Sequence, residues 1–441
     1  TGLFWFGVSI SGVILGYNLF VKAPIIEGLK EISLTFGWAE FVKGTFLDGL
    51  TGSRFSIFFT MVGLSFLVPS KISFSLWLFY ILYLVQLQFM VWWGYGVNEK
   101  SFPTMWWDTV NFKTAESGGA MLVFASVVLF KCRKFIFCIF TPSSLKDLDR
   151  GEQTELRVAS ALFVAGSILL ILYLWLGMGA NLFYTIFSYL IIIVITIGLI
   201  RAVAEGGILG FQCWFGPFHF IRSIFGMDKN WTSPSLYAPL MIYYSILFLD
   251  IKTFIAPAMA NSIKIRDDLK MSRARFHIAI FLGIGIASVV AVISQIILAY
   301  SGGADGMNHW FHTSFPNRWL FQKIVTITKY GPIDTAGGGF WIGFGAASMA
   351  FLLYLRQFIF WLPHPIGMIM LVNPIMQTYW FSIFLGWLFK SLITKYGNKD
   401  TYAAARCTFI GLIVGELIII VIAMFVTIFT DQAITMDLNR N

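Results

Sequence analysis

Charged residues are scarce in this chain, and the shortage excludes a soluble globular protein of ordinary composition. Asp, Glu, Lys and Arg make up 12% of the 441 residues, hydrophobic residues make up 58%, and the mean hydropathy is +0.77. Apolar runs of about 20 residues, the length that crosses a bilayer, recur along the chain. The sequence therefore predicts an all-α fold, a polytopic bundle of transmembrane helices in contact with the lipid bilayer.

Cysteine is also rare, and the motifs of metal and enzyme chemistry are missing. The four cysteines form no CxxC pair, and there is no Walker loop, GxSxG elbow or HExxH motif. His309 and His312 have a spacing that could share a helical face, but without a third ligand an interfacial aromatic loop is the favoured interpretation. We expect neither an enzyme nor a bound metal or cofactor.

The positive net charge of +9 reflects topology. Lys and Arg cluster in short connections between apolar runs, where they orient the helices in the membrane. The connections 141–157 and 264–275 are therefore predicted to lie on the cytoplasmic side. No nucleic acid is expected as a partner.

The apolar runs give an expected order of crossings. They cover residues 3–20, 72–93, 118–140, 159–177, 182–200, 236–260, 277–300, 337–361, 366–392 and 407–430. The run 55–68 is short for a span, so a re-entrant or interfacial element is an equal alternative. We expect one membrane domain over 1–441, the C-terminal part of a longer transporter-like protein, with extramembrane or interfacial loops at 22–55 and 301–336.

Past residue 300 the expected crossings conflict with the charge rule. Two crossings at 337–361 and 366–392 would leave Lys390 and the basic residues after it outside the cell. Either a short element near 319–328 also crosses, or one of the two runs is re-entrant.

A charged, glycine-rich stretch at 201–226 interrupts what would otherwise be a spanning helix. Such breaks survive in a bilayer only where the backbone faces protein or a water-filled cavity. Discontinuous helices with ionisable groups form many mid-membrane transport sites, although a kinked helix with a salt bridge is the structural alternative. The candidate pathway residues here are Arg201, Glu205, Gly206, Gly207 and Gln212.

Asp250 and Asn261 mark a second polar interruption, at the end of the run 236–260. An unpaired charge at that depth costs at least about 2.5 kcal/mol. We therefore expect Asp250 to have a tertiary partner, such as Arg201 or Glu205, and count both interrupting residues among the pathway candidates.

His364 and Gln377 mark a third interruption. His364 lies between two prolines, and Gln377 follows Asn373-Pro374, so backbone carbonyls nearby lack helical donors. Those carbonyls could coordinate a cation or substrate. For His364 a plain turn between helices is an equal alternative, since Pro-x-Pro is turn chemistry.

Two glutamates are candidates for proton coupling. Glu416 would be a lone carboxylate within the last apolar run, and protonation is the easiest way to hold it there. Glu205 lies at the helix break, beside the two glycines.

Four segments carry a family resemblance: LSFLVPSKISFSLWLFY, IRAVAEGGILGF, FLDIKTFIAPAMANSIKIRDD and YLRQFIFWLPHPIG. In order and rough spacing they resemble bacterial membrane proteins related to the oligopeptide transporter superfamily. The resemblance implies an oligopeptide transporter-like helical fold with inverted repeats, and proton-coupled movement of peptides or metal chelates. We therefore expect the bacterial inner membrane as the location. The substrate transfers least well, because one fold hosts many functions.

The leading hypothesis is a secondary-type, proton-coupled membrane transporter. Arg201 would hold an anionic group or pair with Asp250, Glu205 would exchange a proton, and Gly206-Gly207 would expose backbone groups to a small-molecule or peptide substrate. The alternative is a non-transporting membrane subunit that scaffolds or anchors a larger complex, built with copies of this chain or additional membrane subunits. An intramembrane enzyme ranks third, since no nucleophile–base pair is recognisable.

Overall fold

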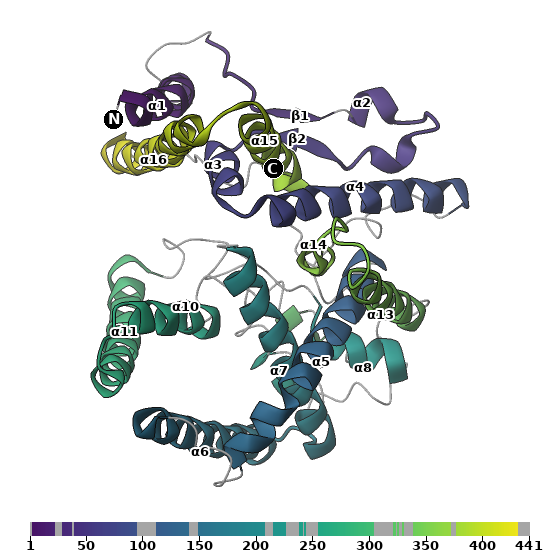
Figure 1. The fold of residues 1–441 in the computed structure, drawn as a ribbon, viewed down its shortest axis with the longest axis vertical. Helices are drawn as coiled ribbons and strands as arrows, with labels where there is room; N and C mark the ends of the chain where they lie inside the picture. Colours follow the sequence, from purple (N-terminus) through teal and green to yellow (C-terminus); the bar gives the residue numbers. More distant parts are fainter. Residues whose placement is uncertain are drawn as a thin grey trace. The chain divides into compact units, whose positions relative to one another are not determined.

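The computed structural model describes most of the chain. The described residues are 2–22, 29–37, 39–94, 112–140, 149–207, 215–225, 238–240, 242–243, 255–303, 321–322, 324–325, 329, 338–371 and 376–430. They are mostly helical (Figure 1), and seven of their helices are long and apolar enough to cross a membrane. The prediction of a helical membrane protein is confirmed at this level.

Most of the long helices overlap the predicted apolar runs, although several bounds differ. The first half contains α1 (Gly2–Lys22), α2 (Ala39–Val42), the 3₁₀ turn η1 (Asp48–Leu50), α3 (Phe59–Leu67), α4 (Ser70–Trp92), α5 (Phe112–Phe140), α6 (Arg150–Leu172) continued by the π-helical turn η3 (Tyr173–Gly177), and α7 (Leu182–Gly206). The second half contains α8 (Pro217–Phe225), α10 (Ile255–Asp268), α11 (Arg273–Gly302), α13 (Gly338–Leu355), α14 (Pro365–Met370), α15 (Met376–Tyr396) and α16 (Lys399–Thr430).

Internal contacts divide the chain into two compact units that alternate along the sequence. Unit 1 comprises Thr1–Pro103, Gly206–Ile208 and Ala347–Asn441, and unit 2 comprises Thr104–Glu205 and Leu209–Ala346. Each unit is described by itself below.

Helices α1 and α16 of unit 1 lie side by side (Figure 1) and approach at glycines. A Cβ atom on Gly7 would overlap the carbonyl oxygen of Thr408, and one on Gly411 would overlap that of Phe4. Four residues after Gly411, a Cβ atom on Gly415 would overlap the side-chain oxygen of Ser11. Small residues at this spacing let helix backbones come close in membranes, where dispersion contacts drive association.

The segment 22–55 holds more structure in its described part than the expected loop. Strand β1 (Thr35–Gly37) pairs antiparallel with β2 (Arg54–Ser56), with Thr35 opposite Ser56. Strands of three residues are too short for an alternating pattern to reveal them. The fold of the described residues is therefore helical apart from this small sheet.

Side chains of α15 satisfy one edge of the sheet. Three of them donate to alternate backbone carbonyls: Gln377 Nε2 to Gly52 at 2.7 Å, Trp380 Nε1 to Arg54 at 2.9 Å, and Ser382 Oγ to Ser56 at 2.6 Å. An open strand edge has no place in a lipid environment unless its polar groups are bonded. This helix therefore supplies the partners that a third strand would otherwise provide.

Helix α5 of unit 2 begins at Phe112, six residues before the predicted apolar run 118–140, so that boundary was wrong. The added turn packs against α13. A Cβ on Gly345 would overlap the carbonyl oxygen of Glu116, and one on Gly119 would overlap that of Ile342. This close contact makes the charged segment helical, which hydropathy alone does not indicate.

Two more boundaries differ from the prediction. Helix α10 continues to Asp268, so the connection to α11 is only the turn 269–272 and not the whole basic segment 264–275. The run 366–392 is not one span, because α14 ends at Met370 and α15 begins at Met376. Pro374 between them cannot donate a helical hydrogen bond.

Candidate functional site

Helix α3 of unit 1 is the centre of the candidate site. Its nine residues extend only about 13 Å, less than half of a bilayer core. It is packed between α15 and α16, and its Phe66 stacks on Phe409 with ring centroids 3.9 Å apart. Of the two alternatives for the run 55–68, α3 is therefore an element that does not cross the membrane by itself.

The first turn of α3 is held by polar side chains from both neighbouring helices. Glu416 of α16 accepts a hydrogen bond from the Thr60 backbone N–H at 2.5 Å. Glu416 is buried, with 5% of its surface exposed. Ser382 of α15 accepts from the Phe58 N–H at 3.0 Å. Helix N-termini carry unsatisfied N–H groups and a partial positive charge, so a carboxylate here is favourable.

The other end of α3 meets a buried cation. Lys390 of α15 donates to the carbonyl oxygen of Val68 at 2.8 Å, and the residue is 7% exposed. Its ammonium also lies 6.0 Å from the Phe66 ring centroid and 5.9 Å from that of Tyr402. Lys390 is one of the basic residues for which the predicted crossings conflict with the charge rule, and the structure buries it against α3.

An ionised Glu416 and the Lys390 ammonium would each match the dipole of α3 at its own end. Each such interaction is worth up to about 2 kcal/mol in a partly buried setting, and removing one partner of a buried charge costs more, about 3–5 kcal/mol. Tyr379 of α15 lies within electrostatic range of Glu416. A change in the charge of Glu416 would thus act directly on the start of α3.

The helix break predicted within 201–226 occurs at Gly206 and Gly207. Helix α7 ends at Gly206, and Gly207 has φ of +61°, a left-handed conformation that favours glycine. The next described helix, α8, begins at Pro217. Gln212 lies outside the described residues.

Arg201 and Glu205 form the salt bridge that the structural alternative requires. Arg201 Nε lies 2.6 Å from Glu205 Oε1, one helical turn apart on α7, and the side chains are 37% and 39% exposed. The Arg201 guanidinium also lies 5.4 Å from the Phe124 ring centroid. Asp250, the other expected partner, lies outside the described residues, and Asn261 is exposed on α10.

His364 and Gln377 make structural contacts. The His364 side chain accepts from the Ile366 N–H at 3.3 Å and so caps α14, while the His364 N–H donates to Ser75 Oγ at 2.5 Å. This is the turn chemistry given above as the alternative. Gln377 bonds the carbonyl oxygen of Gly52, as described for the sheet edge.

Unit 2 buries a polar segment that lies just before the predicted apolar run 118–140. Lys113 is 1% exposed, and Thr114 and Ser117 beside it are buried on the same helix. Close by, Phe215 meets Gly118 and stacks on the buried His219 of α8. The charged residues directly before the long apolar run could have indicated this buried segment. Such residues more often mark a helix end at the membrane surface.

A charged cluster joins α6, α10 and α11 around Glu155. Its carboxylate bonds the Arg266 guanidinium and lies 2.6 Å from His277 Nε2. Hydrogen bonding to Glu155, and less so to Asp267, raises the pKa of Arg266 still further, so the group keeps its charge. The cluster places the start of α6 and the α10–α11 turn at the same end of these helices.

Comparison with known proteins gives a family and no further relative. The chain belongs to the family described as a family of unknown function (DUF6785), whose model matches residues 1–437. Neither the curated proteins nor the solved structures give a match. Within the described residues, no group of three or more His, Cys, Asp or Glu could hold a metal ion. Function therefore has to be inferred from the geometry of the chain itself.

Proposed function

We propose that this member of the DUF6785 family is a secondary-type membrane transporter in which Glu416 carries the coupling proton. One observation carries the proposal: a buried carboxylate holds the first turn of a helix too short to cross the bilayer. Interrupted helices whose ends meet ionisable groups are a common construction of mid-membrane transport sites. The resemblance to the oligopeptide transporter superfamily supports peptides or metal chelates as substrates and the bacterial inner membrane as the location.

Proton exchange at Glu416 would change how firmly α3 is held. The ionised carboxylate complements the positive end of the helix and accepts the Thr60 N–H, and protonation removes that charge and most of the attraction. Lys390 keeps the Val68 end on α15 in either state. Movement of α3 about its Lys390 end is therefore the conformational change that we propose couples proton binding to transport.

Glu205 takes a secondary part in this proposal. It is already paired with Arg201 and is far more exposed than Glu416. We assign the pair to positioning the end of α7 next to the Gly206-Gly207 break, where backbone groups can reach a substrate.

Uptake into proteoliposomes tests the proposal. The protein is offered a mixed pool of short peptides and metal chelates, with and without an inward proton gradient, and accumulated compounds are identified by mass spectrometry. Glu416→Gln keeps an acceptor for the Thr60 N–H but cannot exchange a proton. We expect gradient-driven accumulation by the parent protein, loss of most of it in Glu416→Gln, and retention in Glu205→Gln.

Ser382→Ala is the matched control for structural damage. It removes the neighbouring acceptor at the start of α3 without removing the ionisable group. Its uptake should still depend on the gradient, even if the protein is less stable. If uptake by Glu416→Gln depended on the proton gradient as strongly as uptake by the parent protein, Glu416 would not carry the coupling proton. If Glu416→Gln and Ser382→Ala lost uptake equally, Glu416 would act only as a cap of α3.

A scaffold subunit is the second candidate, and the bare surfaces of α6 and α11 favour it. No residue of α6 is buried, and none of the apolar window in α11 is buried in the described chain. Such faces serve partner helices as well as lipid. Stoichiometric membrane subunits that copurify in mild detergent, together with no uptake of any compound, would favour this function over transport.

A further inference from the structure

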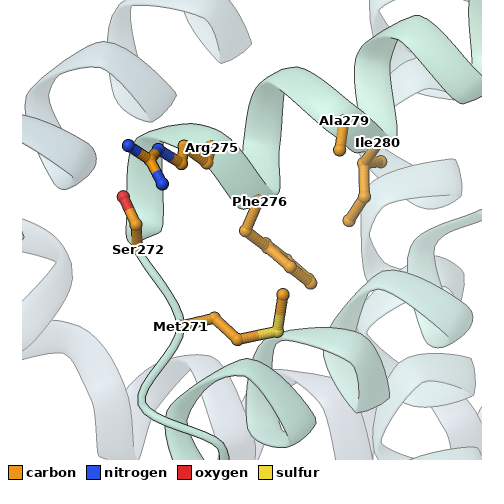
Figure 2. A pocket seen from close by; sticks show the side chains of 6 residues that line it. All are labelled: Met271, Ser272, Arg275, Phe276, Ala279 and Ile280. Atoms are coloured by element: carbon orange, nitrogen blue, oxygen red, sulfur yellow. The ribbon is translucent and has the colours of Figure 1, made fainter.

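A hollow beside the α10–α11 turn of unit 2 combines a cationic side chain with an apolar wall. It has a volume of about 570 Å³ and is lined by Met271, Ser272, Arg275, Phe276, Ala279 and Ile280. Figure 2 shows Ser272 and Arg275 at one end, and the side chains of Phe276, Met271 and Ile280 on the other side. The hollow is thus polar at one end and apolar at the other.

Arg275 differs from the other two arginines around the turn in its surroundings. Arg266 pairs with Glu155 and Asp267, and Arg273 lies 3.5 Å from Glu155 and 3.9 Å from Glu152. Arg275 has no acidic partner among the residues that the structure describes. The carboxylates of α6 are therefore used by its neighbours, and the hollow keeps a surplus positive charge.

The change from polar to apolar lining runs along α11 into the predicted membrane. Ser272 precedes the helix and Arg275 lies in its first turn, whereas Ala279 and Ile280 lie one turn further on. Residues 273–301 form one of the candidate spans. A phospholipid at a membrane surface has the same order of groups, with its phosphate outside and its acyl chains inside.

We propose that this hollow binds an anionic phospholipid. The Arg275 guanidinium pairs with the phosphate, for which its planar donor pattern is well suited. The Ser272 hydroxyl donates a second hydrogen bond, and the first part of an acyl chain lies against Phe276, Met271 and Ile280. Basic side chains next to a span attract anionic lipids at the cytoplasmic surface, which is the side predicted for this turn.

Native mass spectrometry of the purified full chain tests the proposal. The protein is titrated with phosphatidylglycerol or phosphatidylcholine, and bound lipid is counted. We expect a clear preference for phosphatidylglycerol that falls several-fold in Arg275→Gln. Ala279→Phe, which keeps every charge but fills the apolar end, should also lower binding, and inorganic phosphate should not displace the lipid.

Arg133→Gln is the matched control, because Arg133 is an exposed arginine on α5, is predicted to face the same side, and is not among the residues that line the hollow. Its lipid binding should equal that of the parent protein. An equal fall in Arg133→Gln would mean diffuse attraction to basic residues. Displacement by inorganic phosphate would mean a simple anion site, and unchanged binding in Arg275→Gln or Ala279→Phe would place the lipid elsewhere; each of these results overturns the proposal. Thermal unfolding of every variant checks that the fold is retained.

Discussion

Several buried polar side chains in this chain form hydrogen bonds with backbone groups at the ends of helices. Glu416 and Lys390 hold the two ends of α3, and His364 caps α14. Backbone groups at helix ends have no partner within the helix, and lipid cannot supply one. In a membrane protein, a buried polar side chain is therefore often explained by the helix end that it satisfies.

Lys270 shows the same principle at the end of α10. The Met271 N–H bonds the carbonyl oxygen of Arg266 and the Lys270 N–H bonds that of Asp267, which is the Schellman pattern of a helix C-terminus. This pattern needs a left-handed residue, and Lys270 has φ of +51°. A side chain in this conformation is strained, whereas glycine adopts it freely.

Lys270→Gly is therefore expected to stabilise the protein by roughly 0.5–1 kcal/mol, since relief of the strain exceeds the added freedom of the unfolded chain. Thermal unfolding in detergent measures the effect. Lys264→Gly is the control, because Lys264 is exposed in the interior of the same helix, where glycine costs about 1 kcal/mol. A lower melting temperature for Lys270→Gly would contradict the assignment of strain.

Pairs of helices in this protein pack closely at glycine residues. The pairs α1–α16 and α5–α13 approach so closely that a Cβ at Gly411 or Gly345 would overlap a backbone carbonyl oxygen of the facing helix. Backbone cannot move aside as a flexible side chain can. These contacts therefore fix the relative position of the helices within each unit.

Gly345→Ala is expected to destabilise the protein by about 2 kcal/mol, the typical cost of forcing extra volume into a packed contact. Gly343→Ala on the same helix is the control, because a Cβ there meets nothing within 4 Å. Thermal unfolding followed by circular dichroism compares the two. Equal melting temperatures for the variants would show that the α5–α13 contact is looser than the structure has it.

At the scale of the molecule, the side of the membrane on which α6, α7 and α11 begin and end follows from the basic residues of the connections and from the charged cluster around Glu155. Glu155 near the start of α6 contacts Arg266 before the α10–α11 turn and His277 after it. The helix from Arg150 to Gly177, 28 residues in all, is long enough to cross at about 1.5 Å per residue. Its far end at the α6–α7 turn must then lie on the opposite side of the membrane.

Cysteine labelling in oriented vesicles tests this arrangement. In a variant without the four native cysteines, Ser272→Cys should react with an impermeant maleimide only from the cytoplasmic side, as the positive-inside rule requires. Met178→Cys in the α6–α7 turn should react only from the other side. Reaction of both positions from one side would mean that α6 does not span the bilayer.

The sequence determined the properties that depend on neighbouring residues. The length of apolar runs predicted α4, α11 and α16 as membrane helices, and glycine at 206–207 predicted the end of α7. These predictions succeed because the bilayer thickness and the freedom of glycine act on a few consecutive residues. The salt bridge of Arg201 with Glu205 is also local, since its partners are one helical turn apart, but the sequence analysis paired Arg201 with Asp250 and did not predict it.

Only the tertiary structure decided what the isolated polar residues do. Thr60 and Glu416 are 356 positions apart, Val68 and Lys390 are 322 apart, and Gly52 and Gln377 are 325 apart. No local pattern records which distant backbone group such a side chain will meet. The early start of α5 was missed for the same reason, because the glycine contact with α13 that buries it lies far along the chain. Hydrophobic length is a local property, whereas the partner of a buried polar group is set by how the whole chain packs.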